Sequence, residues 1–157
     1  MNSEMKEIIT KTEMDARNYH SQGLNCAESV LKSFLDNNEI DLPEEIMCMA
    51  TGFGGGIGRS RHICGAVTGA VMALGTVKGR AKPLEEGTPA SRAKDLATIY
   101  VPFKEMFNEM EEHFGTVICK EMLAVYKDEN GNECRRNCID TIGYCARKLA
   151  EYAREEA

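Results

Sequence analysis

Hydrophobic positions along this chain recur with the period of an α-helix, and no stretch alternates apolar and polar residues as a strand would. Residues 4–20 gather their apolar side chains near one face and carry Glu, Lys and Asp on the other. This pattern predicts an amphipathic first helix that ends before Gly23. The same period elsewhere predicts an all-α fold.

Capping residues mark the start of the next two helices. Asn25 can cap a helix while Glu28, three residues later, reaches back to the backbone. This capping box predicts a helix that runs from Cys26 until Asn37. Pro43 at a first-turn position then predicts a short third helix.

The most apolar stretch lies in the middle of the chain. From residue 63 to residue 75 there is no charged side chain, and small residues recur at helical spacings: Gly65, Ala66, Gly69, Ala70 and Ala73. Another backbone can approach such a face closely, so we expect residues 62–76 to form a buried central helix. The run of about 15 residues is too short to span a membrane, which needs about 20.

The longest helical pattern follows a polar connector. Thr88 can cap a helix opened by Pro89, and the pattern extends to Phe114, where Gly115 is a suitable carboxyl cap. Pro102 lies inside this pattern, so we expect a kink or a break into two helices there.

Two more helices are predicted near the carboxyl end, a short one over 117–126 and a last one from about 134 to 154. The expectation is therefore one domain, residues 1–157, built as a bundle of about six to seven helices around the central one.

Composition narrows the function classes. The formal net charge of −6 argues against a nucleic-acid-binding surface, which is normally basic. The amino-terminal residues are polar and amphipathic, so we expect a cytoplasmic protein without a membrane span. Structural disulfides are rare in the cytosol, and the seven cysteines therefore favour metal or redox chemistry.

Three cysteines stand at predicted helix starts: Cys26, Cys64 and Cys119. First-turn N–H groups favour an anion there. Arg59, Arg61 and His62 add positive charge just before Cys64, so we expect the pKa of Cys64 to fall below the free value of about 8.5. Cys64 is thus the leading candidate for a reactive or metal-binding sulfur, the alternative being a small buried apolar residue.

The other four cysteines are interpreted from their helical context. Cys48 has no basic neighbour and no helix end nearby, so we expect it to pack. Cys134, Cys138 and Cys145 repeat at helical spacing, which directs all three toward one apolar face of the last helix. A regular helix does not favour disulfide geometry, so these sulfurs are expected to face sulfurs of other helices.

A glycine-rich turn runs from Gly52 to Gly58, ahead of the central helix. It lacks the glycine spacing of a dinucleotide-binding loop and the Lys-Ser/Thr pair of a P-loop. We expect its glycines to adopt positive φ and to approach another backbone or a cluster closely. The residues expected to contact a bound cofactor are Gly54, Gly55, Gly56, Arg59, His62 and Gly65.

The central hexapeptide, Cys64-Gly65-Ala66-Val67-Thr68-Gly69, resembles the Cys-Gly-Ala-x-x-Gly signature of the redox-active protein family labelled C_GCAxxG_C_C. Other segments are also similar to that family, namely 25–30, 52–58, Phe114-Gly115 leading to Cys119, and a cysteine in the terminal helix. The resemblance covers nearly the whole chain. It implies a redox role, and related domains in some cytochromes are similar to iron–sulfur carriers.

Carried over by position, the resemblance implies four site cysteines, as catalytic sulfurs or as metal ligands: Cys26, Cys64, Cys119 and one in the last helix. For the last we choose Cys138, because Ile142, Cys145-Ala146 and Leu149 follow it in the family's pattern. Cys145 is its rival.

Three functions are compatible with these cysteines. In the first, four thiolates bind an iron–sulfur cluster or another thiophilic metal and pass electrons to a redox partner. In the second, an oxidoreductase-type protein exchanges thiols and disulfides, with Cys64 or Cys26 attacking and Cys119 or Cys138 resolving. The third is a helical module that binds a small ligand or a partner and merely packs its cysteines. The sequence leaves open the substrate, the redox partner and whether the chain forms a homo-oligomer.

Overall fold

The computed structural model describes residues 2–125, 130 and 136–155. Within these residues the fold is all-α, with seven α-helices and no strand, as the periodicity predicted. The elements are α1 (Ser3–Ser21), α2 (Cys26–Asn37), the 3-10 helix η1 (Glu44–Met47), α3 (Cys48–Thr51), α4 (Gly65–Lys78), α5 (Pro89–Phe114), α6 (Cys119–Val125) and α7 (Arg136–Tyr152). None of the described helices is both long and apolar enough to cross a membrane. The prediction for Cys134 falls outside the described residues.

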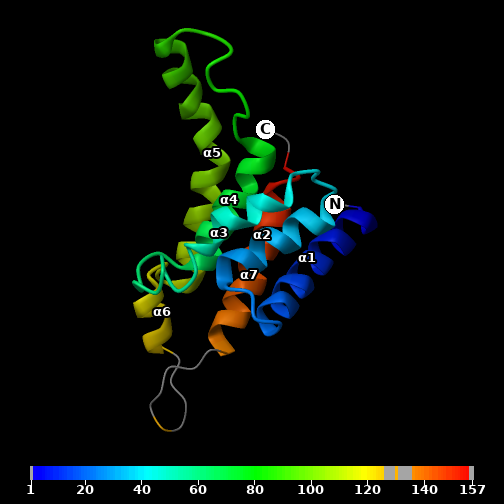
Figure 1. The fold of residues 1–157 in the computed structure, drawn as a ribbon, viewed down its shortest axis with the longest axis vertical. Helices are drawn as coiled ribbons and strands as arrows, with labels where there is room; N and C mark the ends of the chain where they lie inside the picture. The colour runs from blue at the N-terminus through cyan, green and yellow to red at the C-terminus, as the bar shows by residue number, and fades with distance from the viewer. Residues whose placement is uncertain (1, 126–129, 131–135, 156–157) are drawn as a thin grey trace.

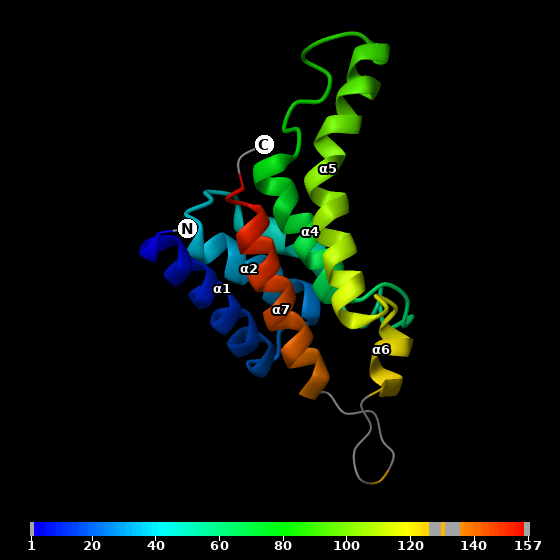
Figure 2. The ribbon, with the colours of Figure 1, turned by 180° about the vertical axis from the view of Figure 1, so that it is seen from behind.

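Helices α1, α2, α4 and α7 form the body of the bundle. Helix α1 packs on α2 and α7, and α4 packs on α2 and α7 from the other side (Figure 1). Helix α5 lies along α4 and α7, and its amino-terminal half extends beyond the body (Figure 2). The beginnings of α2, α4, α6 and α7 lie toward the same end of the bundle, which brings together four segments far apart in the sequence.

The predicted caps form. The Asn25 side chain accepts a hydrogen bond from the Glu28 N–H, and the Glu28 carboxylate accepts one from the Asn25 N–H, both at 2.9 Å. Thr88 caps α5, and Gly115 ends that helix with a left-handed φ of 75°. Because these bonds satisfy backbone groups that a helix end leaves unpaired, they fix where α2, which carries Cys26, begins and where α5 begins and ends.

The central helix α4 is buried on its small-residue face as predicted, but it spans Gly65–Lys78, so it begins three residues later than the predicted range 62–76 and ends two residues later. A side chain at Gly69 would place its Cβ atom 2.8 Å from the carbonyl oxygen of Ala27 and 2.9 Å from its Cα atom. The absence of a side chain at Gly69 therefore sets the distance between α4 and α2.

Two expectations about local structure are corrected. Helix α5 is not broken into two helices at Pro102, because the next turns bury Met106 and Met110 completely and hold the helix against the body. One missing N–H is a small loss beside that burial. Cys48 does not pack, since α3 turns Ala50 into the core and leaves Cys48 exposed.

Candidate functional site: a cavity lined by four cysteines

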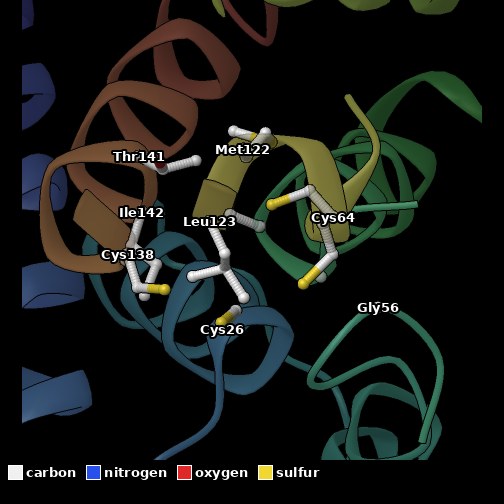
Figure 3. Close-up of a pocket in the computed structure, with 11 residues that line it drawn as sticks. Cys26, Gly56, Cys64, Met122, Leu123, Cys138, Thr141 and Ile142 are labelled. Carbon is white, nitrogen blue, oxygen red and sulfur yellow. The ribbon is translucent and has the colours of Figure 1, made fainter. Parts of the chain in front are cut away.

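Four cysteines from four different segments line one cavity at the end of the bundle where α2, α4, α6 and α7 begin. Cys26 and Cys119 are the first residues of α2 and α6, Cys64 is the residue just before α4, and Cys138 lies in the first turn of α7. Figure 3 shows the side chains of Cys26, Cys64 and Cys138 converging from separate elements. The free volume between them is about 20 Å³, which admits one water-sized atom.

The remaining wall residues are mostly apolar. They are Gly56, Gly65, Ala66, Met122, Leu123, Thr141 and Ile142. A thiol in such surroundings is poorly solvated, which favours its neutral form. The cavity therefore holds its sulfurs as neutral thiols unless a cation or a sulfur–sulfur bond replaces the protons.

Backbone hydrogen bonds hold Cys64 beside Cys119. The Cys64 N–H donates to the carbonyl of Val117 at 2.8 Å, and the Cys119 N–H donates to the carbonyl of His62 at 2.6 Å. An isolated antiparallel bridge between Ile63 and Ile118 continues this pairing. The residues just before α4 and the start of α6 thus position two of the four sulfurs as one unit.

Glycines bring the preceding turn against the sulfurs. At Gly56, with φ of 70°, a Cβ atom would lie 2.7 Å from the Cβ of Cys119. At Gly65 it would lie 2.8 Å from the carbonyl oxygen of Phe53 and 3.2 Å from the Cβ of Cys26. The close approach that the glycine-rich sequence predicted is therefore present at both positions, and larger residues there would push the cavity walls apart.

Cys26 and Cys138 are in direct contact, since their thiols are hydrogen-bonded to each other. This bond, followed by burial and by the nearby Cys64 and Cys138 sulfurs, raises the pKa of Cys26 strongly, while the Gly55 N–H acts in the opposite direction. A proton is therefore retained on this pair well above neutral pH.

The expected low pKa of Cys64 is wrong. Burial raises the pKa of Cys64 to about 11 and outweighs the first-turn N–H groups of Val67 and Ala66, which lower it. Those N–H groups make no capping hydrogen bond to the sulfur by ordinary geometric criteria. The expected cations are also absent from the cavity wall, because Arg59, Arg61 and His62 are exposed on the outer side of the turn.

The structure separates the two rival cysteines of the last helix. Cys138 is half-buried and lines the cavity, whereas Cys145 is fully buried in the core and does not. Burial raises the pKa of Cys145 well above its ordinary value. Of the glycines expected to contact a cofactor, Gly56 and Gly65 line the cavity, Gly55 faces the Cys26 sulfur, and Gly54 packs on the Asn25 side chain.

The four cysteines are the type of ligand that a thiophilic metal site uses, but their sulfur atoms are not arranged around one point. Four thiols are the right number and softness for such a centre. Among the described residues, however, no three His, Cys, Asp or Glu side chains are grouped so as to hold one metal ion. The arrangement brings Cys26 and Cys138 into contact and holds Cys64 and Cys119 on the other wall.

Thr141 is a wall residue that sequence reasoning missed. Thr141 is 3% exposed, and its buried hydroxyl has no hydrogen-bond partner within the described part of the chain. Thr141 lies three residues after Cys138, on the following turn of α7, and lines the same cavity. A buried hydroxyl without a partner can donate to an anion formed nearby, which for this cavity means a thiolate. Its position in the sequence, one turn from a site cysteine, was the available signal.

Comparisons with known proteins identify the family of the chain. A family model described as "Putative redox-active protein (C_GCAxxG_C_C)" matches residues 24–152, which include all four cavity cysteines. The chain is 31% identical over 120 residues to an "Uncharacterized protein" of Archaeoglobus fulgidus, covering 75% of this chain and 77% of that protein. No solved structure matches the chain.

Proposed function

We propose that this chain, which belongs to the C_GCAxxG_C_C family of putative redox-active proteins, is a thiol–disulfide carrier whose exchanging pair is Cys26 and Cys138. One observation carries the proposal: these two thiols are hydrogen-bonded to each other, although they come from helices at opposite ends of the sequence. Two sulfurs already in contact need little movement to form a bond.

The reaction transfers two electrons from the pair to a disulfide substrate. One sulfur of the pair, as its thiolate, attacks a substrate sulfur, breaks the substrate's S–S bond and releases one substrate thiol. The second sulfur of the pair then attacks the mixed disulfide and releases the other substrate thiol. The two protons of Cys26 and Cys138 leave with the two product thiols, so the substrate disulfide is reduced while the protein pair is oxidised.

The surroundings keep the pair protonated until one of its sulfurs ionises. Burial and mutual hydrogen bonding hold protons on the sulfurs, which slows their reaction with oxidants and disulfides alike, because the thiolate is the reactive form. When one sulfur ionises, the Gly55 N–H and the unpartnered Thr141 hydroxyl are donors available to it. The pKa of Cys64 is also raised, to about 11, and less strongly than that of Cys26, so the choice of pair rests on the contact between Cys26 and Cys138 and not on acidity.

A redox titration tests the exchanging pair. Reduced protein is equilibrated against a dithiol–disulfide buffer, trapped by acid, alkylated and digested, and the disulfide is located by mass spectrometry. We expect the crosslinked peptides to contain Cys26 and Cys138. Between pH 10 and pH 11 the midpoint potential should still fall by about 30 mV or more per pH unit, because the raised pKa of Cys26 keeps a proton on the reduced pair.

Two results would count against the exchanging pair. A potential that no longer changes with pH above pH 10 would mean that both thiols had already ionised, contrary to the raised pKa of Cys26. A crosslink between Cys64 and Cys119 in the oxidised protein would move the reaction to the other wall of the cavity.

A second candidate function is favoured by the convergence of four sulfurs from four elements, two more than a carrier pair requires. Cys26, Cys64, Cys119 and Cys138 would be the ligands. An iron–sulfur cluster held by four thiolates transfers single electrons. Anaerobic purification followed by absorption spectroscopy and iron and sulfide analysis decides between the two. For the carrier we expect a colourless protein with less than about 0.1 iron per chain, whereas about four irons with equal sulfide would establish a cluster.

A further inference from the structure

The turn between α3 and α4 contains an uncommon backbone. Its φ angles are positive at Gly55, Gly56 and Gly58, and also at three residues that carry side chains, namely Ile57 (67°), Arg59 (64°) and Arg61 (62°). Glycine adopts this left-handed conformation freely, whereas a Cβ atom makes it costly, most of all in a β-branched residue such as Ile57. We call residues 52–62 the left-handed loop.

The costly positions do not contribute to the core. Ile57 is 46% exposed, and Arg59 and Arg61 are also exposed. Glycine at any of these positions would fold with less strain, as it does at the neighbouring Gly58, around which the structure leaves open space. Strained backbone of this kind is concentrated where proteins act on other molecules. The exposed side chains of Ile57 and Arg59 therefore indicate a role toward something outside the chain.

The inner side of the left-handed loop belongs to the redox cavity. The Gly55 N–H points to the Cys26 sulfur, and Gly56 lines the cavity against Cys119. Arg59 lies directly over Gly55, because a Cβ atom there would be 2.8 Å from the Cγ of Arg59. A single layer of residues in the left-handed loop therefore separates Cys26 and Cys138 from the exposed arginines on the outer side of the loop.

The outer side of the left-handed loop, which we call the rim, carries positive charge although the chain as a whole is negatively charged. The net charge is −6, yet Arg59 and Arg61 lie close together on the loop, and exposed Lys120 joins them through a hydrogen bond from its N–H to the Arg61 carbonyl. An anionic molecule is repelled by the protein as a whole and attracted to this one rim.

We propose that the left-handed loop selects disulfide substrates of low molecular weight that carry carboxylates, with Arg59 and Arg61 binding the carboxylates while Cys26 and Cys138 reduce the disulfide. This inference rests on the proposed function and specifies its substrate class. Guanidinium groups bind carboxylates in a two-pronged geometry that an ammonium cannot match. A small substrate fits because the cavity admits one water-sized atom, so only a slender disulfide can present its sulfur to the pair.

The test compares an anionic and a neutral disulfide. Reduced protein is mixed with dithiodiglycolate, which carries two carboxylates, or with bis(2-hydroxyethyl) disulfide, which is uncharged. For each disulfide, the rate constant with the protein is divided by the rate constant of the same disulfide with free cysteine at the same pH. The value for the anionic disulfide is then divided by the value for the neutral one, which gives the anionic-to-neutral ratio. We expect this ratio to be about ten at low ionic strength and to approach one in about 0.5 M salt, where charges are screened.

Substitutions in the left-handed loop distinguish the effect of its positive charge from the effect of its strained backbone. Arg59→Gln with Arg61→Gln should lower the ratio about tenfold at low salt. Arg59→Gly with Arg61→Gly should lower it equally while raising Tm by about 2–4 °C, because two strained residues are replaced by glycine. Ile57→Gly should raise Tm without lowering the ratio. Lys11→Gln with Lys94→Gln, exposed residues on α1 and on the extended half of α5, changes the net charge equally and should leave the ratio unchanged.

The outcomes distinguish this inference from the function on which it rests. A wild-type ratio near one at low salt, with rapid oxidation by the neutral disulfide, would overturn the substrate class and leave the carrier function intact. An equal fall of the ratio in the Lys11 and Lys94 variant would also overturn it, since net charge rather than the loop would then be responsible. If neither disulfide oxidises Cys26 and Cys138, the carrier function and the substrate class both fail.

Discussion

Replacing Cys138 by serine is expected to slow the release of the second thiol from a disulfide substrate by at least about a hundredfold, because the resolving sulfur would no longer be held against Cys26. Cys26 would instead accumulate as a mixed disulfide with the substrate. Intact-mass spectrometry of samples quenched at successive times measures this directly, since the adduct adds the mass of half the substrate.

Cys48→Ser is the matched control. Cys48 is exposed and lies outside the cavity, so its loss should leave both release steps unchanged. Cys138→Ala should behave as Cys138→Ser does. Agreement between the two variants would show that the slower release comes from the missing sulfur and not from the new hydroxyl. Undiminished release of the second thiol in both Cys138 variants would remove Cys138 from the pair and leave Cys64 as the resolving candidate.

The parts of the fold that could be predicted are those encoded locally. The capping box at Asn25 and Glu28 and the carboxyl cap at Gly115 specify helix ends through a few neighbouring atoms. The small-residue face of α4 also predicted a close neighbour, although only the structure identifies Ala27 as the contact. Local signals thus gave the elements, and the positions of three cysteines at or beside helix starts followed from them.

The chemistry of the cavity was harder to predict because it depends on direction and burial. Only Ile63 lies between His62 and Cys64, yet the left-handed backbone before α4 turns the preceding basic side chains outward while the thiol enters the core. Burial then raises the pKa of Cys64, opposite to the effect expected from its position at a helix start. The contact between Cys26 and Cys138 joins segments separated by most of the chain, and no local pattern encodes such a pairing.

Gly69→Val is expected to destabilise the fold by about 3 kcal/mol more than Gly75→Val, or by about 6–12 °C in Tm. Both glycines lie in α4, so the change in helix propensity from glycine to valine is the same in the two variants. A Cβ atom at Gly69 would meet the backbone of Ala27 at 2.8 Å, whereas one at Gly75 would have no other atom within 4 Å. Thermal unfolding followed by circular dichroism measures the difference, and equal Tm values would show that α4 and α2 do not depend on this contact.

The same substitution should also reach the redox site, because Ala27 follows Cys26 directly. To accept a side chain at Gly69, α2 must move away from α4, and the Cys26 sulfur must then leave the Gly55 N–H, the Cys138 thiol or both. At a temperature where Gly69→Val remains folded, we therefore expect disulfide formation between Cys26 and Cys138 to be at least about tenfold slower than in Gly75→Val. Equal rates in the two folded variants would mean that the pair tolerates displacement of α2, so that the close packing of α4 on α2 supports the fold without positioning the sulfurs.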